Sequence, residues 1–284
     1  MPPHLSRLCY GVVLAMPVSI AILLGIVEGL TEYLPVSSTG HLALAGHLLG
    51  MPDDSASSSF EIVIQLGAIL AVVVHYRALL TERAQGLVRR EPTSIRLLLA
   101  LAIAFAPAAF AGLLFRKAIK AHLFKPTPIA AALIIGGVVM IVIERIRARR
   151  GVVGEDGLER VTPGRALAIG IGQCVSLWPG SSRSMCTIVA GQLAGLSTAT
   201  AAEFSFLLAL PTLGAATLYE GYKARGLLMA HSGGVNLMVG LVVSFFVAWA
   251  VIATFLKYLR THGLEPFGWY RIALGALALW VFSN

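Results

Sequence analysis

The chain has 284 residues, of which 57% are hydrophobic and only 13% are Asp, Glu, Lys or Arg, and its mean hydropathy is +0.82. A soluble domain carries about twice that charged fraction, so the composition excludes a soluble enzyme, a disordered chain and a disulfide-stabilised secreted module. The net charge of +8 does not indicate a nucleic-acid partner, because the basic residues form short clusters between long apolar segments. The sequence predicts an all-α integral membrane protein that forms a single domain over residues 1–284.

The first predicted element, residues 20–50, is an apolar helix interrupted by the sequence PVSSTGH. Each half has about a dozen residues, fewer than the roughly 20 that a helix needs to span a membrane. Irregular backbone at membrane depth is tolerated where protein buries it or water lines it. We therefore expect this segment to form a re-entrant helical hairpin.

Two glutamates precede the interruption with the spacing of one helical turn. Glu28 and Glu32 lie at positions i and i+4, so both carboxylates share one face of the first half-helix. An ionised carboxylate at membrane depth is costly unless it is paired or bound to a cation. A divalent cation between the two would offset their repulsion, so the pair is a candidate metal site. The alternative, two glutamates solvated near the interface, is disfavoured by the apolar sequence on both sides.

Hydroxyl and imidazole side chains crowd the interruption itself. Ser37, Ser38 and Thr39 follow Pro35, and His41 comes within one turn of Ser38. Capping of the second half-helix explains one hydroxyl, but it does not explain three hydroxyls and a histidine beside two glutamates. The free N–H groups at the start of a half-helix suit an anion, and an acid–base partner of Ser38 would stand where His41 stands. We expect catalysis here rather than a histidine that is merely hydrogen-bonded.

Three apolar stretches that are long enough to cross the membrane come next. They cover 60–76, 97–115 and 126–143, and the last two contain no charged residue. Lys and Arg residues gather in the segments between and after them, which we expect to be loops: 77–96, 116–125 and 145–165.

A second interrupted apolar segment, residues 167–195, contains the sequence PGSSRS. Arg183 is the single basic residue between Arg165 and Lys223. Four hydroxyl side chains lie near it in the sequence: Ser181, Ser182, Ser184 and Thr187. A guanidinium among hydroxyls at the start of a half-helix has the chemistry of a phosphate cradle. The alternative is a structural ion pair between Arg183 and one of the two glutamates.

Three more crossings, over 199–219, 235–256 and 269–283, bring the expected number to about six. The basic connections alternate between the two faces of the membrane. The larger share of Lys and Arg lies inside if 77–96, 145–165 and the group formed by Lys257, Arg260 and Arg271 are cytoplasmic. The positive-inside rule favours this orientation.

The two interrupted segments are similar to each other. Matching positions are Gly25-Ile26 with Gly170-Ile171, Glu28 with Gln173, Tyr33 with Trp178, Pro35 with Pro179, and Ser37-Ser38 with Ser181-Ser182. We therefore predict an internal repeat, with one copy over about 18–80 and the other over about 163–225. An odd number of crossings separates the copies, so the second hairpin enters from the opposite face. Such inverted-topology repeats place their sites near the midplane, where broken helices meet.

Two motifs resemble the signatures of a known family: EGLTEYLPVSSTGH at 28–41 and PGSSRS at 179–184. They are similar to those of the undecaprenyl-pyrophosphate phosphatases, also known as bacitracin-resistance phosphatases. The resemblance covers nearly the whole chain and departs at Met185-Cys186, where small residues are more usual. It implies a bacterial cytoplasmic membrane protein whose site opens to the extracytoplasmic side. It also implies hydrolysis of undecaprenyl pyrophosphate to undecaprenyl phosphate and phosphate, which recycles the carrier lipid of peptidoglycan synthesis, with Mg²⁺ or Ca²⁺ as cofactor.

The candidate residues suggest a mechanism for this chemistry. Arg183 and the half-helix N–H groups would bind the terminal phosphate, and the two glutamates would hold the metal. Ser38 is the first candidate for the nucleophile, activated by a neighbouring carboxylate or by His41; attack by His41 itself or by a metal-activated water stays open. The hydroxyls expected to contact phosphate are Ser37, Thr39, Ser181, Ser182, Ser184 and Thr187.

The rival class is an inverted-repeat secondary transporter or lipid flippase for an anionic substrate. It would explain Arg183 as a ligand of the cargo, but it explains the clustered Glu, Ser and His side chains poorly. The sequence leaves open whether the protein is a monomer or a homodimer.

Overall fold

The computed structural model describes residues 16–52, 55–231 and 233–283, and every regular element in them is helical. Arg7 and Cys9 lie outside these ranges. The α-helices are α1 (Val18–Thr31), α2 (Ser38–Leu48), α3 (Ser55–His75), α4 (Arg77–Val88), α5 (Pro92–His122), α6 (Pro126–Arg149), α7 (Pro163–Cys174), α8 (Arg183–Leu193), α9 (Thr198–His231), α10 (Gly233–Leu259) and α11 (Glu265–Ser283). Two short 3₁₀ helices, η1 (Leu158–Arg160) and η2 (Val175–Leu177), flank α7. The prediction of an all-α protein is confirmed.

Among the residues that the structure describes, five helices are long and apolar enough to cross a membrane, so the chain is a multi-pass membrane protein. The stretches that qualify are Ser57–His75, Pro92–Ile119, Pro126–Arg149, Thr198–Met229 and Gly234–Leu259. Four of the predicted crossings lie inside these stretches, and a fifth, 60–76, does so except for Tyr76. The remaining one, 269–283, is helical as part of α11, but α11 is not among the five.

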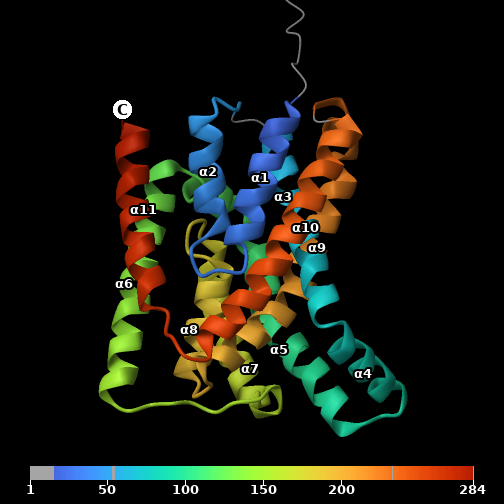
Figure 1. The fold of residues 1–284 in the computed structure, drawn as a ribbon, viewed down its shortest axis with the longest axis vertical. Helices are drawn as coiled ribbons and strands as arrows, with labels where there is room; N and C mark the ends of the chain where they lie inside the picture. Colours follow the sequence, from blue (N-terminus) through green and yellow to red (C-terminus); the bar gives the residue numbers. More distant parts are fainter. Residues whose placement is uncertain (1–15, 53–54, 232, 284) are drawn as a thin grey trace, which may run out of the picture.

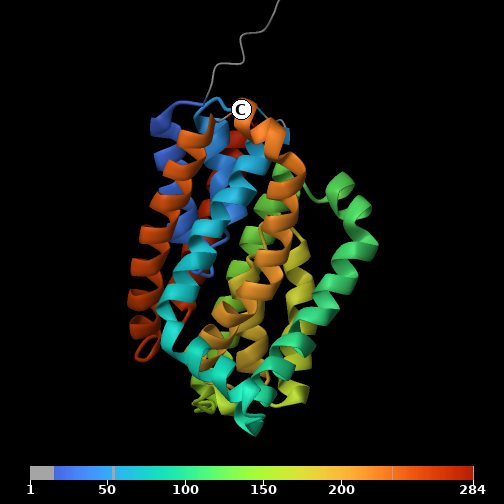
Figure 2. The same cartoon turned by 90° about the vertical axis from the view of Figure 1, so that its right-hand side faces the viewer.

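The two interrupted segments approach the middle of the molecule from opposite ends (Figure 1). Helices α1 and α2 lie in the upper half of that view, and the turn between them reaches mid-height. Helices α7 and α8 lie in the lower half, and their connection reaches the same level. The longer helices α3, α9 and α10 pack against one another beside them, while α6 and α11 run side by side along one edge. Figure 2 shows the end of α5 that precedes α6 standing away from the other helices.

Small residues let the site-bearing helices approach their neighbours closely. A Cβ atom on Gly137 of α6 would come within 2.5 Å of the Gly268 carbonyl oxygen in α11. A Cβ atom on Gly25 of α1 would come within 2.7 Å of the Gly240 carbonyl oxygen in α10. Neither contact leaves room for a larger residue, so both helix pairs depend on glycine at these points.

The structure differs from the prediction between residues 77 and 96, where we expected a loop. The chain forms α4 there and turns into α5 at Pro92. Of the α4 residues, only Gly86 is buried. Strong helix formers such as Ala, Leu, Glu, Gln and Arg fill the segment, and their propensity favours a helix even where little side-chain burial supports one. Helices α5 and α6 likewise run past the predicted crossings.

The connection between α6 and α7 is fastened to the turn between α8 and α9. The Glu155 N–H donates to the Gly195 carbonyl oxygen at 2.9 Å, and the Ser197 N–H donates to the Glu155 carbonyl oxygen at 2.9 Å. Arg165 forms an ion pair with the Glu155 carboxylate and donates a hydrogen bond to it. The hydrogen bond lowers the pKa of Glu155 below its ordinary value. The lower end of the bundle is thereby held together by its connections as well as its helices.

Candidate active site

Two serines with left-handed backbone begin the half-helices that follow the interruptions. Ser37 has φ 74° and caps α2, and Ser182 has φ 71° and caps α8. The Ser37 hydroxyl accepts from the Gly40 N–H at 3.3 Å, and the Ser182 hydroxyl accepts from the Met185 N–H at 3.2 Å. Because such φ values cost a non-glycine residue about 1 kcal/mol or more, the surrounding structure must hold both turns in place.

Glu32 lies at the centre of the site, because its carboxylate joins the two interrupted segments. Its Oε2 atom accepts a hydrogen bond from Ser38 Oγ at 2.7 Å, and its Oε1 atom accepts one from Arg183 Nη2 at 3.0 Å. The side chains of Arg183 and Glu32 are only 9% and 5% exposed. Charge-assisted hydrogen bonds in such a setting are strong. The structure therefore brings the predicted site residues Glu32, Ser38 and Arg183 together. Arg183 forms its ion pair with Glu32 rather than with Glu28.

Arg183 is held from several sides, yet one of its donors is unused. Its Nη1 atom donates to Ser205, to the carbonyl oxygen at 2.9 Å and to Oγ at 3.1 Å. The guanidinium also lies over the Tyr33 ring, 5.5 Å from its centre. The buried Nε atom has no hydrogen-bond partner among the described residues. Buried donors are normally satisfied, so this one is suited to an acceptor from outside the protein.

The hydroxyls around Arg183 are bonded to the protein itself. Ser184 Oγ donates to the Leu34 carbonyl oxygen at 2.9 Å and so joins the two turns directly. Ser182 Oγ lies 3.0 Å from Ser184 Oγ. Thr187 Oγ1 donates to the Arg183 carbonyl oxygen at 2.8 Å. These residues hold Arg183 and the turns in place, and their contacts to phosphate stay predictions.

Three other predicted phosphate ligands lie outside the Glu32 contacts. The Ser37 hydroxyl is used as a cap, Thr39 is exposed on α2, and Ser181 is buried in the second turn. None of them is brought against the Arg183–Glu32 pair by a hydrogen bond that the structure describes. Their role in binding phosphate also stays a prediction.

Glu28 is the second acidic residue of the site, one helical turn before Glu32 in α1. It is fully buried, and neither of its carboxylate oxygens has a hydrogen-bond partner among the described residues. An ionised carboxylate without a partner in a protein interior is costly. No hydrogen bond among the described residues occupies the Glu28 oxygens, and the metal role predicted for Glu28 and Glu32 stays a prediction.

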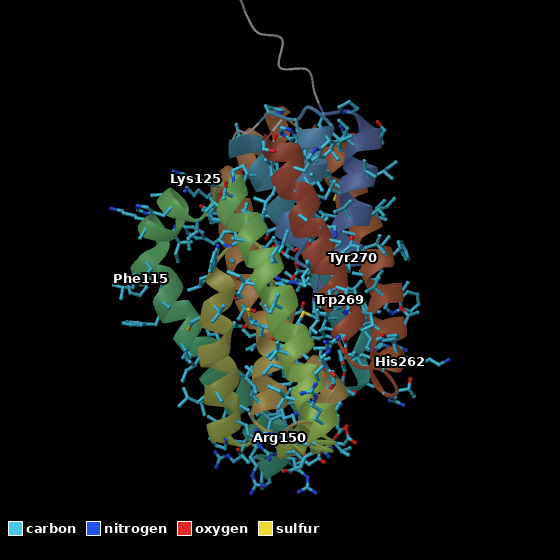
Figure 3. All side chains as sticks on the ribbon, turned by 90° about the vertical axis from the view of Figure 1, so that its left-hand side faces the viewer. Phe115, Lys125, Arg150, His262, Trp269 and Tyr270 are labelled. Carbon is cyan, nitrogen blue, oxygen red and sulfur yellow. The ribbon has the colours of Figure 1, made fainter. Side chains whose placement is uncertain are left out.

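His41 faces away from Ser38 and Glu32. Its Nδ1 atom lies 2.8 Å from the Ser37 carbonyl oxygen, and its Nε2 atom lies 2.7 Å from the Tyr270 hydroxyl. The two rings are stacked, with centres 5.6 Å apart. Figure 3 shows Tyr270 near the mid-height of the molecule. Both ring nitrogens of His41 are thus engaged away from Ser38, which the structure pairs with Glu32 instead.

Arg271 is a site residue that the sequence analysis missed. The prediction that Arg271 belongs to a cytoplasmic cluster with Lys257 and Arg260 is wrong, because its side chain is fully buried in α11. Its guanidinium donates to four carbonyl oxygens: Pro35 at 3.1 Å, Gly180 at 2.9 Å, Ala132 at 3.1 Å and Leu133 at 3.3 Å. The first two belong to the two interruptions, so one side chain ties both turns to α6. The sequence signal was a charge inside the apolar stretch 269–283, obscured by its nearness to other basic residues.

These features define a class: a multi-pass membrane protein whose polar centre, built from Glu, Ser and Arg side chains, is buried where two interrupted helical segments meet. A family model described as Bacitracin resistance protein BacA matches residues 21–277. The chain belongs to this family, the BacA or undecaprenyl-diphosphatase family.

Curated relatives agree with that assignment over most of their length. An Undecaprenyl-diphosphatase of Sorangium cellulosum (strain So ce56) is 64% identical over 92% of this chain and 85% of its own. Undecaprenyl-diphosphatase 2 of Rhodospirillum rubrum is 49% identical over 91% of this chain and 93% of its own. An Undecaprenyl-diphosphatase of Cupriavidus necator is 46% identical with the same coverage. The family resemblance seen in the two motifs is confirmed.

Proposed function

We propose that this chain hydrolyses undecaprenyl diphosphate to undecaprenyl phosphate and inorganic phosphate, and so recycles a lipid carrier within the bacterial cytoplasmic membrane. The observation that carries the proposal is the buried contact of Ser38 and Arg183 with one carboxylate, Glu32. It combines a nucleophile, a proton acceptor and a phosphate-binding cation in one place. Family membership supplies the substrate.

Ser38 attacks the terminal phosphorus in this mechanism. Its Oγ atom forms a bond to phosphorus while the bond from phosphorus to the bridging oxygen breaks, and Glu32 accepts the Ser38 proton across the 2.7 Å hydrogen bond. Undecaprenyl phosphate leaves, and water then hydrolyses the phosphoserine. Arg183 binds the phosphate oxygens with its unused Nε donor, since phosphoryl transfer depends mostly on positioning and charge. Direct attack by His41 is disfavoured by its bonds to Ser37 and Tyr270.

We propose that the site also uses a divalent cation, Mg²⁺ or Ca²⁺, bound between the two glutamates of α1. Glu28 and Glu32 would hold it, because no described residue forms a hydrogen bond with the Glu28 oxygens. The described residues contain no group of three or more His, Cys, Asp or Glu side chains that could hold a metal, so the remaining ligands would be water and substrate oxygens. When bound, the cation supplies positive charge that stabilises the phosphate oxygens.

The interrupted segments are proposed to be re-entrant hairpins of an inverted repeat. Three observations support this. The capping residues Ser37 and Ser182 share a positive φ. Helix α1 packs on α10 and α7 packs on α5, so each interrupted segment packs on a long helix from the other half of the chain. The two turns reach mid-height from opposite ends of the molecule (Figure 1). By their capping positions, Ser37 in the first repeat corresponds to Ser182 in the second. The sequence comparison matched Ser37 with Ser181, one position earlier. The alternation of basic connections supports a site that opens to the extracytoplasmic side.

Release of phosphate from a polyprenyl diphosphate by the purified full-length protein in detergent, with and without EDTA, tests the activity. We expect release that EDTA abolishes and that Mg²⁺ or Ca²⁺ restores. Ser38→Ala should lower turnover at least about 100-fold while the lipid still binds. Thr254→Ala, an exposed hydroxyl on α10, serves as the matched control and should turn over normally.

Two parallel quenches with substrate labelled on the terminal phosphate, one acidic and one alkaline, identify the nucleophile, because phosphoserine survives acid and phosphohistidine survives alkali. Label on Ser38 supports the proposed step, whereas label on His41 would assign the attack to the imidazole. No release under any metal would favour the rival class, a transporter or flippase.

A further inference from the structure

A second polar pocket lies where α3 and α10 end, in the lower half of the molecule (Figure 1). It has a volume of about 400 Å³, and its polar lining residues are His75, Tyr76, Glu203, Lys257 and Arg260. Ala253 and Leu256 complete the wall. The pocket shares no lining residue with the candidate active site. It therefore needs an explanation of its own.

One donor in this pocket is unsatisfied. The Tyr76 hydroxyl is buried and has no hydrogen-bond partner among the described residues. Burial raises the pKa of Tyr76, so the hydroxyl keeps its proton and stays a donor. The His75 ring packs edge-on against Tyr76, with centres 4.9 Å apart, and limits the movement of the phenol. A buried donor fixed in this way is suited to an acceptor that enters the pocket.

The charges of the pocket favour an anionic acceptor. Lys257 and Arg260 contribute two positive charges and Glu203 one negative charge. The Glu203 carboxylate interacts electrostatically with Arg260. The same combination occurs in the candidate active site, where Arg183 pairs with Glu32 and still has a free donor. A guanidinium and an ammonium beside a hydroxyl donor are the groups that proteins use for phosphate.

We propose that this pocket binds a phosphate group, either the headgroup of a lipid phosphate or free inorganic phosphate. Ala253 and Leu256 give the wall an apolar side that suits the first alkyl carbons of a lipid. The pocket lies at the end of the bundle where α6 also finishes, and Figure 3 shows Arg150 at that end. The proposal does not depend on the hydrolytic activity of the other site.

The test is equilibrium dialysis of purified full-length protein in a neutral detergent against two labelled probes, inorganic phosphate and dodecyl phosphate. The Arg183→Gln background removes the main phosphate-binding charge of the active site, so that the binding which remains reports the second pocket. In that background we compare the double variant Lys257→Gln/Arg260→Gln with the control Lys117→Gln/Lys223→Gln. The control removes the same charge from two exposed positions outside the pocket.

We expect one saturable site in the Arg183→Gln protein, weakened at least about tenfold by Lys257→Gln/Arg260→Gln and unchanged in the control, because each lost charge-assisted bond is worth roughly that factor. Tyr76→Phe removes a single hydroxyl and should weaken binding several-fold. Glu203→Gln removes a repulsive carboxylate and should tighten it. The same pocket changes in an otherwise wild-type chain should leave phosphate release within twofold, which checks that the variants fold.

The two probes separate the two sources of phosphate. Tighter binding of dodecyl phosphate than of inorganic phosphate assigns the pocket to a lipid headgroup, and equal binding assigns it to the free anion. The proposal is overturned if the Arg183→Gln protein has no saturable site, or if the double variant binds as well as its control. Loss of binding in Glu203→Gln would also overturn it, since that result would show that the carboxylate, and not the positive charge of the pocket, is what the bound phosphate requires.

Discussion

At the scale of single residues, Glu32 decides what the site can do. Its two oxygens have different partners, so the Ser38 proton and the Arg183 guanidinium do not compete for the same atom. A carboxylate arranged in this way can take a proton on one side while the other side fixes Arg183, the proposed phosphate-binding group. Among the described residues Glu28 has no hydrogen-bond partner of either kind, and this difference is why we propose separate roles for two glutamates that look equivalent in the sequence.

Replacing Glu32 with glutamine should therefore affect chemistry more than binding. We expect Glu32→Gln to lower kcat at least about 100-fold, because the amide cannot accept the Ser38 proton. The variant keeps a hydrogen-bonding oxygen, so gross unfolding is not expected. The measurement is steady-state phosphate release, with Glu82→Gln on α4 as an exposed control. Equal loss in both variants would show that removal of a carboxylate charge anywhere has this effect.

At the scale of elements, the turns that interrupt the helices depend on backbone that a serine rarely adopts. Ser37 supplies both the positive φ and the capping hydroxyl at the start of α2. Glycine would retain the φ without strain and lose only the cap, whereas alanine would lose the cap and keep the strain.

Ser37→Ala should consequently destabilise the protein more than Ser37→Gly, by about 1–2 kcal/mol. Unfolding by SDS titration in mixed micelles measures the difference. The paired change at Ser182 should rank in the same order, because that residue caps α8 with the same geometry. Greater stability of the alanine variant would mean that the positive φ is not retained in solution.

Much of this architecture could be predicted from the sequence. Half-helices too short to span, broken by Pro and Ser, predicted the two interruptions, and the charges at Glu32 and Arg183 inside apolar sequence predicted the polar centre. The partner of Ser38 could not be predicted, because His41 lies only three residues after it and Glu32 lies six residues before it across the interruption, and only the turn at Ser37 brings Glu32 against it. The helix α4 was missed because its charges suggested a loop.

Arg271 escaped prediction because its charge lies close to other basic residues in the sequence, and because its partners are backbone carbonyls, which the sequence does not reveal. Arg271→Lys keeps the charge but loses the planar fork, so several of the four carbonyl oxygens would lose their donor. We expect a loss of about 3 kcal/mol or more in unfolding free energy, together with lower turnover. Arg145→Lys is the matched control, because Arg145 also links α6 to α11 through Glu265 but is half exposed, and it should cost less than about 1 kcal/mol. Similar losses in the two variants would contradict this account.

At the scale of the whole molecule, the basic residues give the bundle a direction in the membrane. We expect the turn between α4 and α5 to face the cytoplasm and the last part of α9 to face the outside. Single cysteines at Arg89→Cys and Lys223→Cys, in a chain whose native cysteines are replaced by alanine, test this. A membrane-impermeant maleimide should label Lys223→Cys in intact cells and Arg89→Cys only after permeabilisation. The reverse pattern would invert the proposed orientation.

The contacts of Arg271 also set the order in which the site is completed during synthesis. Glu32 and Ser38 emerge from the ribosome early and Arg183 later, while Arg271 is made after all of them. Until it arrives, the carbonyl groups of Pro35 and Gly180 lack the donor that ties the two turns together. A growing chain therefore carries Ser38, the proposed nucleophile, long before the two turns are tied together. Chains cut short before Arg271 would also lack most of α11, so we expect them to enter the membrane without becoming active until the last helix has packed against α6.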